Sequence, residues 1–65
     1  MLGENIYLQR TQIGMTQENL SDYLHLTKTT ISKWENNQAK PDIDYLILMA
    51  NLFDISLDDL VGYQK

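Results

Sequence analysis

Residues 16–35 (TQENLSDYLHLTKTTISKWE) limit what the chain can fold into, because they hold two short helical patterns with almost no room between them. Thr16 is suited to cap a helix that runs from residue 17 to residue 23 or 24. Thr27 is suited to cap a second helix, from residue 28 to residue 35 or 36. Only a short turn remains between them, so the two helices are expected to cross steeply.

The apolar side chains of this stretch fall on one side of each helix. They are spaced by three or four residues, which places them together on a helical face. The residues expected to fix the crossing are Leu20, Leu24, Leu26, Ile31 and Trp34. The opposite side of the second helix carries short hydroxyl groups and lysines, which can hydrogen-bond to base edges. This arrangement allows the first helix to lie across a DNA backbone while the second enters the major groove.

A further helix is expected before this stretch, from residue 2 or 3 to residue 13. Gly14 would end it, because glycine readily adopts the left-handed conformation found after helix C-termini. Its expected buried face consists of Leu2, Ile6, Arg10 and Ile13.

Two helices are expected after the motif. Pro41 precedes the first of them, which covers residues 42–53, and Ser56 caps a short last helix. The core-facing stripe of residues 42–53 is predicted to contain Leu46, Met49, Ala50 and Phe53. The predicted fold is therefore an all-α, compact bundle of five short helices. Residues 1–65 are expected to form a single domain with the motif at about residues 16–36.

Composition excludes several classes of protein. The chain has no cysteine, so neither disulfides nor thiolate metal sites are expected, and a cytoplasmic location is predicted. The longest apolar run, residues 46–50, is too short for a membrane span, and no signal peptide precedes it. His25 is the only histidine and has no carboxylate at a useful spacing, and glycine-rich phosphate loops are missing. We therefore predict no enzyme activity, cofactor, metal or small-molecule ligand.

Charge is distributed unevenly along the chain. The net charge is −4, whereas nucleic-acid binders usually carry a basic surface. Residues 24–41 hold three lysines and one glutamate, while residues 42–65 hold five aspartates and one lysine. With so few cations near the motif, useful affinity for DNA is expected to require two copies of the chain.

The chain resembles the phage-repressor-like helix-turn-helix family, also called the Xre or Cro/CI type, over nearly its whole length. The matching positions are Ile6, Arg10, residues 14–17 (GMTQ), Leu20 and Ser21, residues 31–35 (ISKWE), Lys40 and Pro41, and residues 55–60 (ISLDDL). The resemblance implies a lambda-repressor-like five-helix fold. It also implies a transcriptional regulator, expected to act as a repressor, that binds double-stranded DNA as a homodimer at a roughly palindromic operator.

Carried over by position, the resemblance also assigns roles to individual side chains. The residues expected to contact bases are Thr27, Lys28, Thr29, Ser32 and Lys33, and those expected to contact phosphates are Gln17, Asn36 and Lys40. Arg10 and Glu35 are expected to form a structural bridge between the first helix and the end of the third. Three positions that are often glycine in the family hold His25, Asn37 and Asp54 here. These residue types are enriched at positive φ, so the turns are expected to persist.

Residues 42–53 carry a second apolar set beside the core-facing stripe. We expect this set to contribute to a homodimer or inter-domain contact, with partial exposure of ordinary surface residues as the alternative. The set consists of Tyr45, Leu48 and Leu52, joined by Leu57, Val61 or Tyr63 from the C-terminal end. Together with the acidic surface, it also supports a second functional hypothesis. In that hypothesis the chain is a helix-turn-helix-fold protein-interaction module with weak or no DNA binding.

Overall fold

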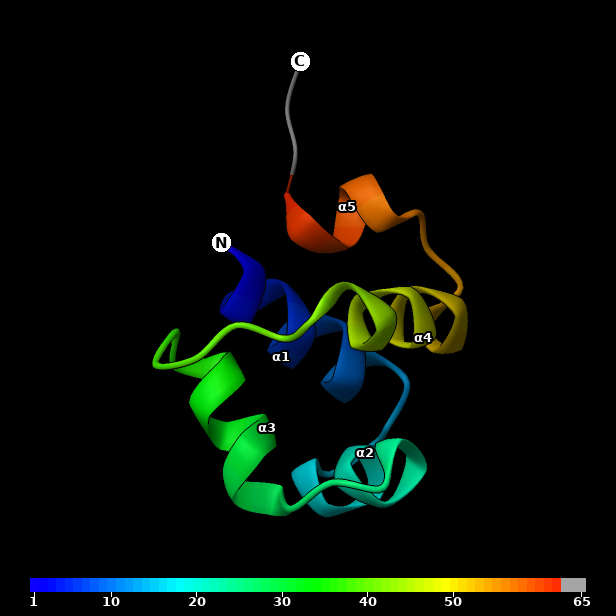
Figure 1. Ribbon diagram of the computed structural model, residues 1–65. Coiled ribbons are helices and arrows are strands. Elements are labelled where there is room, and N and C mark those ends of the chain that lie inside the picture. The colour runs from blue at the N-terminus through cyan, green and yellow to red at the C-terminus, as the bar shows by residue number, and fades with distance from the viewer. Residues whose placement is uncertain (63–65) are drawn as a thin grey trace.

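The computed structural model describes residues 1–62, which form five helices and no strand (Figure 1). The helices are α1 (Leu2–Gln12), α2 (Gln17–Leu24), α3 (Lys28–Glu35), α4 (Ile43–Phe53) and α5 (Leu57–Val61). The predicted all-α, five-helix fold is confirmed, and the helix ends agree with the sequence-based bounds to about one residue. Within residues 1–62, none of the helices has the length and apolar character needed to cross a bilayer.

Every helix contributes one fully buried side chain to a common core. These five residues are Ile6, Leu20, Ile31, Met49 and Leu60. Burying an aliphatic side chain of this size contributes about 1.5–3 kcal/mol. Through this core, α2 and α3 pack together with the other three helices. Figure 1 shows α2 and α3 at the end of the molecule opposite α5.

Three of the helices begin at the caps that the sequence predicts. The side-chain oxygens of Thr16, Thr27 and Ser56 accept N–H groups from three residues further along, at 3.0, 3.4 and 3.0 Å. At α2 the cap is reciprocal, because Asn19 Oδ1 accepts the N–H of Thr16 at 3.0 Å. This second bond was not predicted, since glutamate or glutamine usually fills that place in a capping box.

The expected left-handed turns are present. His25, Asn37 and Asp54 have φ angles of 59°, 59° and 58°, and Gly14 has a φ of 79°. His25 and Asp54 occupy the C-cap positions of α2 and α4. The helices α2 and α4 therefore end directly before a left-handed residue, and at α2 this residue forms the short turn that leads to α3.

The apolar surface differs from the prediction at both α1 and α4. Ile13 was expected in the core but is 46% exposed, because α1 ends at Gln12 and Ile13 turns away as its C-cap. Leu46 is only partly buried. On α4, Ile43 and Ile47 are 56% and 45% exposed, which was not predicted.

A close contact between the start of α1 and the end of α3 was not predicted. Met1, at the N-cap of α1, provides no side-chain cap, and Asn37 Oδ1 instead accepts the N–H of Gly3 at 3.2 Å. A Cβ atom on Gly3 would lie 2.5 Å from the carbonyl oxygen of Glu35 and 2.6 Å from that of Trp34. Only glycine allows the two helix ends to approach this closely.

Candidate nucleic-acid interface

The outer side of α3 is the surface on which the sequence analysis placed the base contacts. Burial of Ile31 and Trp34, which are 0% and 5% exposed, turns the opposite side of α3 toward solvent. Thr27, Lys28, Thr29 and Lys33 are exposed, and Ser32 is half-buried. The structure therefore brings the five predicted base-contacting residues to the surface. Their side chains offer hydroxyl and ammonium groups, and none is acidic.

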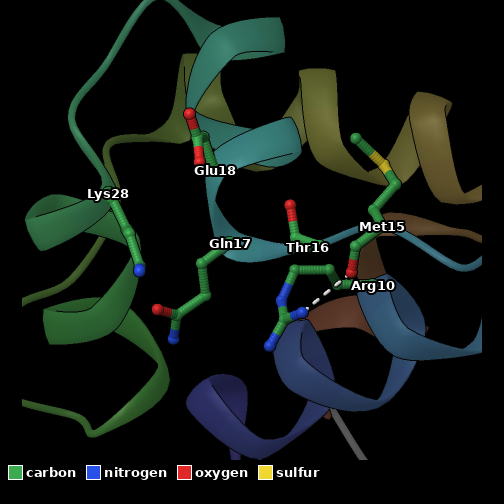
Figure 2. Close-up of a pocket in the computed structure, with 6 residues that line it drawn as sticks. All are labelled: Arg10, Met15, Thr16, Gln17, Glu18 and Lys28. Carbon is green, nitrogen blue, oxygen red and sulfur yellow. Dashed lines mark hydrogen bonds between the residues drawn. The ribbon is translucent and has the colours of Figure 1, made fainter.

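A pocket of about 410 Å³ lies where the start of α2 meets the start of α3 (Figure 2). Its lining residues are Arg10, Met15, Thr16, Gln17, Glu18 and Lys28. Figure 2 shows the Gln17 side chain lying between Lys28 and Arg10. The pocket thus combines two cations and one carboxylate around a neutral amide.

The expected bridge between Arg10 and Glu35 is present as a two-pronged ion pair. Arg10 Nε donates to Glu35 Oε2 at 2.7 Å, and Arg10 Nη2 donates to Oε1 at 3.1 Å. The two side chains are only 8% and 6% exposed. Arg10 Nη1 also donates to the carbonyl oxygen of Met15 at 2.8 Å, the bond drawn in Figure 2. The only carboxylate of α3 is therefore neutralised beneath the exposed surface of that helix.

Gln17 has a partner that the sequence analysis did not foresee. Its Nε2 donates to Glu35 Oε1 at 3.0 Å, so the predicted phosphate-contacting side chain is held by the end of α3. The two residues are 18 positions apart, and no local pattern in the sequence links them. Glu35 consequently connects α1, α2 and α3 through three hydrogen bonds.

The other two predicted phosphate contacts lie at and beyond the end of α3. Asn36 and Lys40 are both exposed. Asn36 Nδ2 donates to the carbonyl oxygen of Ser32 at 2.9 Å and lies 3.4 Å from its Oγ. A phosphate contact through this amide therefore requires the side chain to release at least one of these bonds.

The predicted contact surface on α4 and α5 is only partly exposed. Tyr45 and Leu52 pack against the core, and the centroids of the Tyr45 and Trp34 rings lie 5.6 Å apart. Leu48 is 43% exposed, on the same helix as the exposed Ile43 and Ile47. Of the C-terminal residues in the predicted set, Leu57 and Val61 are half-buried, and Tyr63 lies outside the described residues.

Three proteins with similar sequences are named as transcriptional regulators or as an activator or repressor of transcription. The chain is 36% identical over 61 residues to the uncharacterised HTH-type transcriptional regulator YqaE of Bacillus subtilis, covering 94% of this chain and 53% of that protein. It is 33% identical over 62 residues to the HTH-type transcriptional activator BcrR of Enterococcus faecalis, covering 95% of this chain and 30% of that protein. It is also 30% identical over 59 residues to the cryptic phage CTXphi transcriptional repressor RstR of Vibrio cholerae, covering 91% of this chain and 53% of that protein.

A solved structure and a family model cover the same helices. A transcriptional regulator from Listeria innocua superposes with a TM-score of 0.94 at 29% identity, over 100% of this chain and 61% of that one. By comparison, the chain spans about a third to a half of the length of the three curated relatives named above. The family model described as "Helix-turn-helix" matches residues 6–60, which extend from α1 into α5. By this match and by its relatives, the chain belongs to the helix-turn-helix family.

Proposed function

We propose that the chain is a sequence-specific, double-stranded DNA-binding transcriptional regulator that inserts α3 into the major groove. The observation that carries the proposal is the outer side of α3, where hydroxyl and ammonium groups are exposed while the Glu35 carboxylate is buried and paired. Such groups suit base edges, whereas an exposed carboxylate would repel the DNA backbone. The relatives are named as transcriptional regulators, which are not enzymes, and this agrees with the prediction from the sequence.

Selection from a random duplex library with the purified protein tests this proposal. A recurring sequence among the selected duplexes is expected, because the α3 side chains distinguish base pairs in the major groove. Bound duplexes without any common sequence would leave only non-specific binding, and no bound duplex at low salt would overturn the proposal.

The proposal divides the exposed polar residues into two groups. Base edges are read by Thr27, Lys28, Thr29, Ser32 and Lys33. Phosphates are contacted by Gln17, Asn36 and Lys40. The first turn of α2 supports the second group, because helix N-termini present N–H groups to anions. Thr16 caps the N–H of Asn19, which leaves those of Gln17 and Glu18 available for phosphate among the residues described.

Substituting Lys28 and Lys40 separately by alanine distinguishes these roles. Loss of Lys28 is expected to weaken binding to the selected site by about 1–3 kcal/mol and to change the preferred base at one position. Loss of Lys40 is expected to weaken all sequences about equally and to reduce the dependence of affinity on salt. Binding of both variants to a randomised site library provides the measurement. Identical changes across the library for the two variants would contradict the division of roles.

We further propose that two copies bind a roughly palindromic operator, with half-sites about 34–36 Å apart. The small number of cations around α3 supports this, since two copies double the phosphate contacts. Repression is the proposed outcome, because occupying an operator requires no surface beyond the DNA-binding one.

The exposed side of α4 is the proposed contact between the two copies. Replacing Leu48 by glutamate is expected to shift a dimer toward monomer, since a charge would be buried in an apolar contact. Size-exclusion chromatography with light scattering measures the change. Leu8→Glu is a matched control, because Leu8 on α1 is 48% exposed and Leu48 is 43% exposed. An unchanged mass for the Leu48 variant, or an equal shift for the Leu8 variant, would exclude this surface.

A second candidate function is that of a protein-interaction module. The exposed Ile43, Ile47 and Leu48 on α4 favour it, together with the net charge of −4. A salt titration of duplex binding separates the two functions. Phosphate contacts make the affinity fall steeply as salt is raised. Weak binding that is insensitive to salt would favour the interaction module.

A further inference from the structure

Glu35 makes more contacts than an ion pair requires. Its Oε2 accepts one N–H of Arg10, and its Oε1 accepts both a second N–H of Arg10 and one from Gln17. The carboxylate is 6% exposed, whereas Gln17 is half-buried at the edge of the pocket. The buried carboxylate of Glu35 on α3 therefore holds the first side chain of α2 in one orientation.

The chemistry of a primary amide gives this bond a consequence. The Gln17 Nε2 atom carries two hydrogens, of which Glu35 Oε1 accepts one and leaves the other free to donate. The acceptor is a carboxylate, and a hydrogen bond to an ionised group is stronger than one between neutral groups, so this 3.0 Å bond holds the amide in place. Figure 2 shows this amide in the pocket on the side of Lys28, whose exposed ammonium group would attract an anionic oxygen.

We propose that Glu35 is a positioning residue for DNA binding, which holds one N–H of the Gln17 amide so that the other is presented to a backbone phosphate. This inference rests on the proposed DNA-binding function and adds a residue that does not itself touch the DNA. Holding a glutamine in its bound rotamer removes part of the ordering cost of binding, which corresponds to about a 2- to 12-fold gain in affinity per copy.

Two paired variants isolate the bond to Gln17 from the ion pair. Arg10→Met/Glu35→Gln removes both charges and retains a carbonyl oxygen that can accept from Gln17. Arg10→Met/Glu35→Leu removes both charges and the acceptor. Both lose Arg10, so any direct effect of that residue cancels in the comparison. Each is measured with and without Gln17→Ala, on the selected site and on an unrelated duplex, after thermal unfolding has established that it is folded.

The expected result is that the Arg10→Met/Glu35→Leu variant binds both duplexes about 2- to 12-fold more weakly per copy than the Arg10→Met/Glu35→Gln variant. Adding Gln17→Ala should then lower the DNA affinity of the variant with Glu35→Gln by a similar factor and leave the affinity of the variant with Glu35→Leu unchanged. Equal affinities of the two pairs, or an equal effect of Gln17→Ala in both, would overturn the role of Glu35 while leaving the proposed function intact. Failure of the unmodified protein to bind any duplex at low salt would overturn both.

The side-chain amide resonances of Gln17 provide a second test on the unmodified protein, which does not require the variants to fold. One amide proton is expected downfield, because it is bonded to a carboxylate, and it should stay there when duplex DNA is added. The other proton should shift on DNA addition. Two protons at the positions of a freely rotating glutamine, or both shifting together, would contradict the proposal.

Discussion

Replacing Arg10 by methionine is expected to lower the free energy of unfolding by about 3–5 kcal/mol. The substitution leaves the Glu35 carboxylate 6% exposed without its cation, and a buried unpaired charge is costly. It also removes the donor to the Met15 carbonyl oxygen. The loss is comparable with the whole stability of a domain of this size, roughly 3–10 kcal/mol. Urea unfolding followed by the fluorescence of Trp34, the only tryptophan, measures it.

Two controls distinguish this cost from a general effect of losing a basic residue. Lys40→Met removes an exposed cation and is expected to change the stability by less than about 0.5 kcal/mol. Arg10→Met/Glu35→Leu removes both charges and should recover most of the loss, because apolar replacements of buried ion pairs are often neutral or stabilising. A cost for Arg10→Met no larger than that for Lys40→Met would show that the pair is dispensable.

Replacing Gly3 by alanine is expected to cost about 2–3 kcal/mol, the upper part of the range for overpacking. The new methyl group would lie 2.5 and 2.6 Å from two backbone carbonyl oxygens of α3, which no side-chain rotation can relieve. The end of α3 or the start of α1 must therefore move. Any gain from helix propensity is smaller, at about 0.5–1 kcal/mol. Urea unfolding measures the difference.

Gly14 provides the matched control, because a Cβ atom there would meet no atom within 4 Å. Its φ of 79° alone makes alanine unfavourable, by about 1–2 kcal/mol. Asparagine tolerates this region, so Gly14→Asn should cost less than Gly14→Ala. At Gly3 the order is reversed, since a larger side chain worsens the contact. If Gly3→Asn lowered the stability less than Gly3→Ala does, steric overlap would not be the cause of the destabilisation at Gly3.

The features that could be predicted from the sequence are those set by neighbours in the chain. Thr16, Thr27 and Ser56 cap helices because a hydroxyl reaches an N–H three residues away. His25 and Asp54 end helices because their residue types tolerate positive φ. Such local effects need no knowledge of the tertiary arrangement, and the five helices followed from them.

The features that were missed join residues far apart in the chain. The bond between Gly3 and Asn37 spans 34 residues, and that between Gln17 and Glu35 spans 18. No sequence pattern around Gln17, at the start of α2, indicates that its amide will bond to Glu35 at the end of α3. The resemblance did suggest the pairing of Arg10 with Glu35, since it carried information about a fold and not only about a sequence.

The apolar residues of α4 show a different limit. Helical spacing grouped Tyr45, Leu48 and Leu52 together, yet Tyr45 and Leu52 pack against the core while Leu48 is 43% exposed. Periodicity gives the angle between side chains around a helix, but not how far the neighbouring helices wrap around it. Ile43 and Ile47 were overlooked for the same reason.

The contact between Asn37 and Gly3 also bears on which helix end opens most easily. The helices α2 and α3 have caps within their own sequence, so their first turns do not depend on another helix. The start of α1 instead takes its cap from Asn37, which is in place only after α3 has ended and turned. We therefore expect the amides of the first turn of α1 to exchange with solvent through local opening, while those of α3 exchange only on global unfolding. The first turn of α1 is thus expected to open more often than the motif does, although the two are in contact in the folded protein.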